Sequence, residues 1–221
     1  MPHILALDSS TEACSCAISI DGEISESFEL IPRGHTRHIL PMIQAQMQQA
    51  GLEFEQLDAV AVGAGPGSFT GLRIAAGVAQ GIAFGADIPL IPVSTLSSMA
   101  QQKLAQHNRI LSCLDARINE VYWALFDCTD GQLKRLGTEH LTKPEALILE
   151  SDMPCFAVGD GMAFLDSMPA ATRALITGIE TDIYPRSATI AELAGTLWSQ
   201  GLTMDPADFS PSYLRNCVTH S

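Results

Sequence analysis

The second half of this 221-residue sequence repeats, in the same order, features of the first half. An apolar run at residues 4–7 leads into Asp8, and another at residues 110–114 leads into Asp115. Each half continues with a second apolar run, an Asp-Gly pair and, further on, an Ala-Val-Gly-x-Gly stretch. One such feature is an ordinary strand-turn-strand pattern, but four in one order indicate an internal duplication.

The apolar runs predict a mixture of strands and helices. The expected elements of the first half are strands at residues 4–7, 14–20, 23–30, 59–62 and 89–93 and helices at residues 36–50, 70–85 and 95–106. Three antiparallel strands followed by alternating helices and strands form the ribonuclease H-like arrangement. Two such lobes make the actin-like, sugar-kinase-like (ASKHA) α/β architecture, in which ligands bind between the lobes. This likeness of fold names no reaction.

The expected lobes are residues 1–104 and residues 105–221, and the tail after Asp208 can return to the first lobe. With 47% hydrophobic residues, a chain of this length should bury a sizeable core. The net charge of −13 argues against an autonomous nucleic-acid binder, because phosphate contacts need clustered Lys and Arg. The longest runs without a charged residue span 15 positions, short of the roughly 20 that cross a bilayer. A soluble, cytoplasmic protein with reduced cysteines is therefore expected.

Two stretches have the composition of a phosphate-binding site. In the first, Asp8 is followed by two serines, whereas its counterpart Asp115 is followed by Ala-Arg-Ile, without the glycines that let backbone amides close around a phosphate. This loss argues against a kinase or ATPase that works alone and leaves weak or shared nucleotide binding open. The second stretch, residues 63–73, is glycine-rich and leads into a predicted helix. This pattern is typical either of an anion-binding site or of a tight turn whose hydroxyl side chain is the N-cap of the helix. The candidate anion- or nucleotide-binding residues are Asp8, Ser9, Ser10, Gly65, Gly67, Ser68 and Thr70.

No catalytic or metal-binding constellation emerges from the sequence. His35 and His38 form the only close histidine pair, and no third ligand stands near them. The other histidines are scattered, and no nucleophile motif accompanies them. We therefore expect neither catalytic residues nor a metal site.

The helix after the glycine-rich loop carries Gly77, Gly81 and Gly85 at four-residue spacing. Glycine costs about 1 kcal/mol relative to alanine within a helix, so this stripe needs a packing reason. Close backbone approach supplies one, either to the sheet of the same lobe or to a helix of another subunit. In the second case the preceding helix would form the other half of the surface.

Several motifs together resemble the TsaB family of bacterial proteins, also called YeaZ. The resemblance covers the whole chain and is most specific in the glycine-rich stretch. It is carried by Asp8-Ser-Ser-Thr-Glu-Ala-Cys14, His35-Thr36, Leu40-Pro41, Gly65-Pro-Gly-Ser-Phe-Thr-Gly71-x-Arg73 and Tyr213-Leu-Arg-Asn216. In the catalytic relatives of this family a metal is held by a His-x-x-x-His pair, and His35 and His38 do not have that spacing.

The resemblance implies a non-catalytic activator in the formation of threonylcarbamoyladenosine on tRNAs that read codons starting with A. The implied partners are a TsaD-type catalytic subunit, a TsaE-type ATPase and, when the chain is alone, a second copy of itself. The chain is expected to contact tRNA only indirectly, through the complex, and to bind no membrane. No cofactor is required by this chain, and ATP or ADP at a joint site stays open. The implied interface residues are Ile39, Leu40, Ile43, Met47, Arg73, Ala76, Gly77, Gln80, Gly81 and Phe84. The alternative is a stand-alone ATP-dependent kinase or transferase that uses Asp8 and the loop at residues 65–70.

Overall fold

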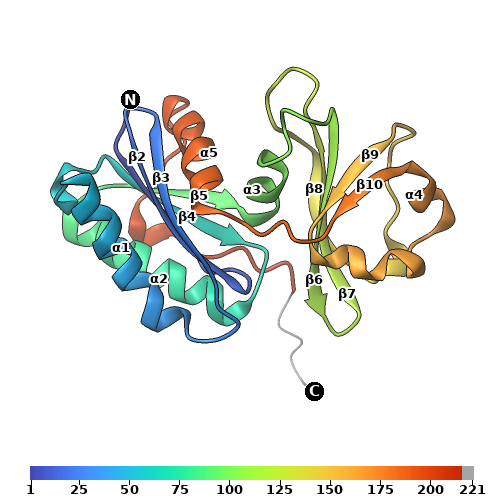
Figure 1. Cartoon of the computed structure of the whole chain (residues 1–221), viewed down its shortest axis with the longest axis horizontal. Helices are drawn as coiled ribbons and strands as arrows, with labels where there is room; N and C mark the ends of the chain where they lie inside the picture. The colour runs from blue at the N-terminus through green and yellow to red at the C-terminus, as the bar shows by residue number, and fades with distance from the viewer. Residues whose placement is uncertain (216–221) are drawn as a thin grey trace. The chain divides into compact units, whose positions relative to one another are not determined.

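A computed structural model describes residues 1–215 and divides the chain into two α/β units (Figure 1). The first unit contains Met1–Ser98 and Pro185–Ser212, and the second contains Met99–Tyr184 and residues 213–215 of the tail. The units differ from the expected lobes, because the chain returns to the first unit well before Asp208 and brings a whole helix with it.

The first unit is built on a five-stranded sheet. Its strands are β1 (Ile4–Asp8), β2 (Ala13–Ile20), β3 (Glu23–Leu30), β4 (Ala59–Gly65) and β5 (Leu90–Ser94), in the order β3-β2-β1-β4-β5. The first three strands are antiparallel, whereas β4 and β5 run parallel to β1. Asp21 and Gly22 have φ values of 51° and 92° and form the expected hairpin turn between β2 and β3.

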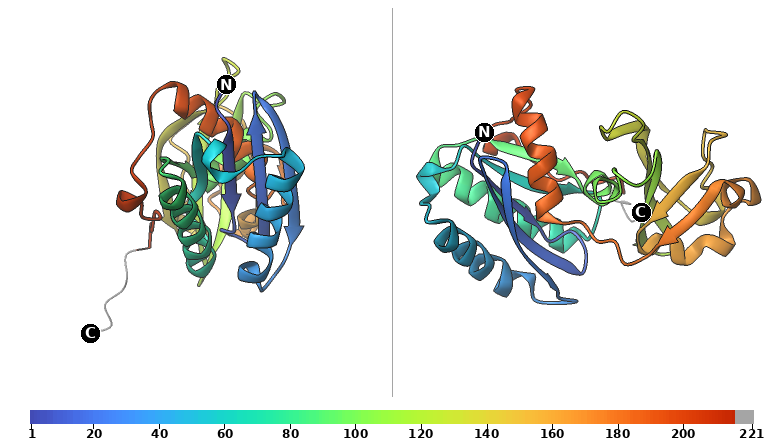
Figure 2. Two further views of the ribbon diagram at one scale, coloured as in Figure 1. Left: turned by 90° about the vertical axis from the view of Figure 1, so that its left-hand side faces the viewer. Right: turned by 45° about the horizontal axis from the view of Figure 1, so that its top comes forward.

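Long helices cover both faces of this sheet. Figures 1 and 2 show α1 (His35–Ala50) and α2 (Phe69–Ala86) side by side on one face and α5 (Ser187–Ser199) on the other. The core under α1 and α2 is rich in Leu, Ile and Val, whereas α5 packs over a face of the sheet that contains several alanines. The expected helix at residues 95–106 is shorter, because α3 covers only Thr95–Gln101.

The second unit repeats the first sheet and confirms the duplication. Its strands are β6 (Arg109–Arg117), β7 (Glu120–Asp127), β8 (Lys134–Thr142), β9 (Cys155–Val158) and β10 (Ile176–Glu180). Their order, β8-β7-β6-β9-β10, matches that of the first sheet strand for strand. The helices do not match, since η2 (Pro144–Ala146), η3 (Asp160–Ser167) and α4 (Ala170–Leu175) are all short. Within residues 1–215, only the first unit therefore presents two long helices side by side.

The remaining short elements are η1 (Phe54–Gln56) and η4 (Pro206–Asp208). Five cysteines are buried and free of disulfides, and Cys217 lies outside the described residues, as does Asn216 of the tail motif. Among residues 1–215, no helix is both long and apolar enough to cross a membrane.

Candidate functional site

The carboxylate of Asp8 is enclosed at the end of β1. Its exposed fraction is 0%, and Oδ1 accepts hydrogen bonds from the Ser10 backbone N–H at 3.0 Å and from Ser10 Oγ at 2.9 Å. Gly63 lies so close that a Cβ atom there would be 1.9 Å from Asp8 Oδ2. Burial raises the pKa of Asp8 to about 6, and the hydrogen bonds from Ser10 oppose this rise.

The glycine-rich loop closes over the two serines that follow Asp8. A Cβ atom at Gly71 would lie 1.9 Å from the Ser9 carbonyl oxygen, and one at Gly67 would lie 2.4 Å from that of Ser10. Ser9 Oγ donates to the Gly71 carbonyl at 2.8 Å. The glycines are thus needed for close backbone approach within the unit.

Ser68 is the N-cap of α2, since its hydroxyl accepts a hydrogen bond from the Gly71 N–H at 3.3 Å. The tight-turn interpretation of the loop is therefore correct in its geometry. The fold also brings the candidate anion-binding residues together in one unit. Asp8, Ser9 and Ser10 are buried and bond to one another or to the loop, whereas Ser68 and Thr70 are exposed.

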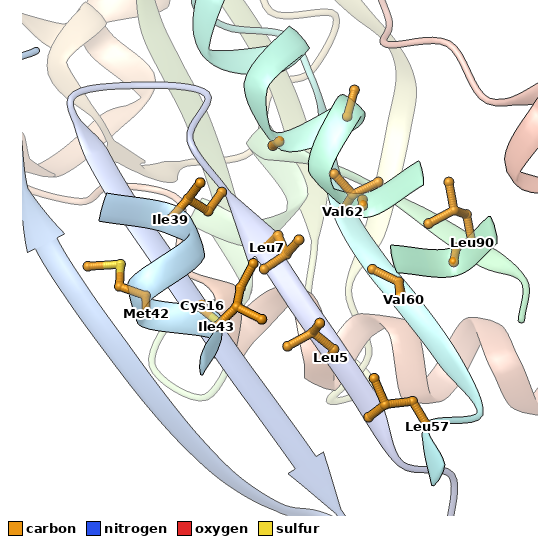
Figure 3. Close-up of a cluster of buried hydrophobic side chains, with 14 of the residues drawn as sticks. Leu5, Leu7, Cys16, Ile39, Met42, Ile43, Leu57, Val60, Val62 and Leu90 are labelled. Atoms are coloured by element: carbon orange, nitrogen blue, oxygen red, sulfur yellow. The ribbon is translucent and has the colours of Figure 1, made fainter. Parts of the chain in front are cut away.

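Three predicted interface residues of α1 belong to the core instead. Ile39, Ile43 and Met47 are at most 5% exposed and belong to the core of the unit. Figure 3 shows Ile39 and Ile43 pointing from α1 toward the sheet. A stripe of apolar residues at four-residue spacing is typical both of a helix face that packs on its own core and of one that docks on a partner. In α1 the stripe packs on the core of its own unit. Leu40, by contrast, is 51% exposed and remains on the outer surface.

The outer surface of α2 is the glycine stripe. Ala75, Ala79 and Ala83 are fully buried against the unit's own core. Gly77 and Gly81 lie two positions further along, roughly 200° away at about 100° per residue, and so point outward. Both are exposed, and among the described residues nothing beyond the adjacent helix backbone lies within 4 Å of a Cβ atom built on either, nor on Gly85. The interpretation that the glycines pack on the sheet of the same lobe is therefore wrong.

Two further predicted interface residues also have other roles. Ala76 is only 5% exposed and belongs to the core. Gln80 Nε2 donates to the carbonyl oxygens of Pro206 at 2.7 Å and Phe209 at 3.2 Å. This side chain therefore connects α2 to the segment Pro185–Ser212, which returns to the first unit.

We predict that Gln80→Ala lowers the free energy of unfolding by about 1–2 kcal/mol, because two partly buried carbonyls lose the hydrogen bonds from this side chain. Chemical denaturation of the two chains measures this difference. If Gln80 acted only as an exposed contact residue, the stability of the variant would equal that of the wild-type chain.

The outer surface of the two helices is uncharged apart from two arginines. The segments 35–50 and 69–86 contain no Asp or Glu, although the whole chain has 25 of them. Arg73 lies over the ring of Phe69 at 3.8 Å from its centroid, and Phe69 is 52% exposed. We call this surface the α1–α2 face, and it comprises Leu40, Phe69, Arg73, Gly77, Gly81 and Phe84. Sequence reasoning missed Phe69, although it stands inside the Gly-Ser-Phe-Thr-Gly motif.

The histidine pair does not assemble a metal site. His38 Nδ1 lies 3.1 Å from Glu29 Oε2, and His35 Nε2 is buried without a hydrogen-bond partner. Within the described part of the chain, no three His, Cys, Asp or Glu side chains lie together in a way that could hold a metal ion.

Comparison with known proteins identifies the family. Residues 29–217 match the family described as "TsaD: tRNA N6-adenosine threonylcarbamoyltransferase". The chain is 41% identical to the tRNA threonylcarbamoyladenosine biosynthesis protein TsaB of Haemophilus influenzae, over 98% of this chain and 94% of that one. It is 38% identical to the TsaB protein of Escherichia coli, over 98% and 96% of the two chains. The structure of YeaZ from Pseudomonas aeruginosa superimposes with a TM-score of 0.91 at 35% identity, covering 97% of this chain and 100% of the other. The chain therefore belongs to the TsaB (YeaZ) family and has its actin-like fold of two ribonuclease H-like lobes.

Proposed function

We propose that this protein is a non-catalytic subunit in the biosynthesis of threonylcarbamoyladenosine on tRNA, and that its α1–α2 face binds a TsaD-type catalytic subunit. The names of its full-length relatives support a role in this biosynthesis. We extend the proposal to tRNAs that read codons starting with A, which the sequence resemblance implies. In this role the chain acts in the cytoplasm and binds tRNA through the complex.

The observation that carries the proposal is the outward glycine stripe. Glycines inside a helix cost stability, and in the described part of the chain nothing beyond the adjacent helix backbone packs within 4 Å of a Cβ built at Gly77, Gly81 or Gly85 to offset that cost. Exposed Leu40 and Phe84 lie on the same two helices. A partner helix that approaches the α2 backbone closely would use the glycines and bury these apolar side chains. The absence of carboxylates from both helices also leaves the face free of the desolvation cost of buried anions.

A non-catalytic role is supported by the burial and the internal hydrogen bonds of Asp8 and the two serines that follow it. The carboxylate and the serine hydroxyls that would serve a phosphate or a metal are buried and bonded within their own unit. The residues that follow Asp115 in the second unit, Ala116-Arg117-Ile118, include no glycine that would let backbone amides close around a phosphate. We propose that ATP or ADP, where it is used, is bound jointly with the partners, and that a TsaE-type ATPase joins the complex. Self-association through the α1–α2 face is proposed for the chain alone.

The test is tRNA threonylcarbamoylation in a reconstituted mixture of synthase, TsaD-type subunit, TsaE-type ATPase and tRNA. We expect full activity with this chain present, at least a hundredfold less when it is omitted, and none from the chain alone. Activity unchanged by omission would reject the role. Activity from the chain alone would instead support the ATP-dependent transferase that uses Asp8 and the loop at residues 65–70.

A further inference from the structure

We propose that the charges at the two ends of the α1–α2 face make a second copy of this chain dock with its helices antiparallel to those of the first. In this arrangement the basic end of each copy lies against the acidic end of the other. The inference rests on the proposed function, because it gives the orientation of the self-association proposed for the chain alone. It concerns the first unit only.

The two helices of this face run in the same direction. β2 is antiparallel to both β1 and β3, and β4 is parallel to β1, so β3 and β4 point the same way. Because α1 follows β3 and α2 follows β4, both helices begin at one edge of the sheet and end at the other. Figure 1 shows them side by side, so that their beginnings and their ends form the two ends of one surface.

Most of the positive charge of the first unit lies where these two helices begin. The unit contains four Lys or Arg residues, of which Arg186 pairs with Glu26. The other three, which we call the basic end, are Arg33, Arg37 and Arg73, and all three are exposed. Among residues 1–215, Arg33 and Arg37 have no ion-pair partner.

Carboxylates lie where the same helices end. Glu53 and Glu55 follow the end of α1, and Asp87 is the C-cap of α2. These three exposed residues are the acidic end. The sequence has no Lys or Arg between Arg37 and Arg73, and none between Arg73 and Lys103. The surface therefore has opposite charge at its two ends.

This distribution is the reverse of the one that stabilises a helix by itself. A helix carries partial positive charge at its beginning and partial negative charge at its end, which favours acidic residues in the first turn and basic residues in the last. Neither α1 nor α2 has an acidic residue in its first turn or a basic residue in its last turn. The side-chain charges thus add to the helix dipoles instead of opposing them. The isolated chain gains nothing from this pattern, whereas a partner of opposite polarity would.

A second copy supplies that opposite polarity in one orientation. In a two-fold dimer formed through this face, the axis lies either along the helices, which keeps them parallel, or across them, which makes them antiparallel. Parallel packing brings the two basic ends together and the two acidic ends together, and like charges repel. Antiparallel packing sets each basic end against the acidic end of the other copy, so the attraction occurs twice. Charge complementarity therefore favours the antiparallel dimer.

The glycine stripe fits the same arrangement. Gly77 and Gly81 lie near the middle of α2, which spans Phe69–Ala86. A two-fold axis that crosses α2 midway between them sets Gly77 of one copy opposite Gly81 of the other, where the two backbones can approach closely. With this axis, Arg73 of one copy is level with position 85 of the other, two positions before Asp87.

The test measures the dissociation constant of the dimer of the full chain by sedimentation equilibrium. We expect it to rise about tenfold between roughly 50 mM and 500 mM NaCl, because salt screens the attraction between the ends. At the lower salt concentration, Arg37→Glu should weaken the dimer about tenfold. Arg173→Glu is the matched control, since it makes the same change of net charge at an exposed arginine of α4 in the second unit. The control should dimerise within about twofold of wild type.

A second substitution tests the pairing of opposite ends. Glu55→Lys, added to Arg37→Glu in the same chain, should restore most of the affinity. Positions 37 and 55 lie at opposite ends of α1, a 16-residue helix about 24 Å long, so the two new charges meet only between copies. Arg37→Glu places an acidic residue in the first turn of α1, which favours the folded helix. Thermal unfolding followed by circular dichroism should therefore show a midpoint no lower than that of the wild-type chain.

The outcomes separate this inference from the proposed function. If the wild-type chain dimerises and Arg37→Glu dimerises as tightly or more tightly, self-association stands and the antiparallel orientation is overturned. A weaker dimer that Glu55→Lys does not restore overturns the pairing of basic and acidic ends. A wild-type chain that stays monomeric yet binds the TsaD-type subunit overturns this inference and leaves the main proposal intact. If it binds neither, both are wrong.

Discussion

Replacing Gly81 with leucine is expected to abolish the complex with the TsaD-type subunit while leaving the isolated chain folded. Among residues 1–215, nothing apart from the adjacent backbone of α2 lies within 4 Å of a Cβ built at Gly81, so the leucine side chain starts from open space. Its four side-chain carbons would instead stand between α2 and the partner and prevent close approach of the two backbones. We expect affinity to fall at least a thousandfold, measured by calorimetry, with a matching loss of tRNA modification.

Gly195→Leu is the matched control for this substitution. Gly195 lies in α5, on the opposite face of the same sheet, and a Cβ there also has nothing within 4 Å. Each change replaces a helical glycine with a better helix former, which favours the folded state by roughly 0.8 kcal/mol. Both variants should therefore unfold at or slightly above the wild-type temperature, and only Gly81→Leu should lose the partner. Equal binding by the two variants would remove α2 from the interface.

The duplicated sheets were predictable because they depend on patterns that sequence displays directly. Apolar runs of strand length and an Asp-Gly turn at residues 21–22 specify hairpins locally, and their repetition in the second half specifies a second sheet of the same order. The return of Pro185–Ser212 to the first unit was not predictable in the same way. The apolar stripe of α5 shows that this helix is half-buried, but it carries no mark of which of two similar sheets it covers.

The candidate interface was predicted less well, for a reason that lies in helix geometry. In α2 the glycine stripe and the alanine stripe of Ala75, Ala79 and Ala83 have the same four-residue spacing, so spacing alone does not say which one faces the sheet. In α1 the same ambiguity led to the prediction that Ile43 lies on the outer surface, whereas the structure buries it in the core. What decides is the alignment of each helix on the sheet, and this depends on the whole core. Leu40 and Phe84 fall off the inward stripe and are exposed, and their place in an interface stays a prediction.

The second large effect is expected at Asp8, where substitution by asparagine should stabilise the chain above pH 6. The pKa of the buried carboxyl is raised from its ordinary value of 3.8 to about 6, chiefly by desolvation. Between these two values the folded state binds more protons than the unfolded state, so wild-type stability falls as the pH rises through this window and levels off above it. The gap between the two pKa values corresponds to about 3 kcal/mol at 1.36 kcal/mol per pKa unit.

The uncharged amide of the Asp8→Asn variant avoids this cost and keeps an oxygen that can accept from Ser10. Unfolding of the variant at pH 8 should therefore require about 3 kcal/mol more than unfolding of the wild type, whereas at pH 3.5 the two chains should be equally stable.

The same substitution decides between the two functions considered for this fold. An enzyme that uses Asp8 to hold a metal or a phosphate would lose turnover when the carboxylate is replaced, and its stability gain would come at the expense of activity. A subunit that works through its outer helices should retain full tRNA modification in the reconstituted mixture. Asp115→Asn is the control, because it changes the counterpart aspartate of the duplication, which pairs with Arg117 and is partly exposed. That variant should be no more stable than wild type at pH 8. If Asp8→Asn lowered tRNA modification a hundredfold or more while binding of the partner stayed intact, Asp8 would be a catalytic residue. The proposal of a non-catalytic subunit would then be wrong.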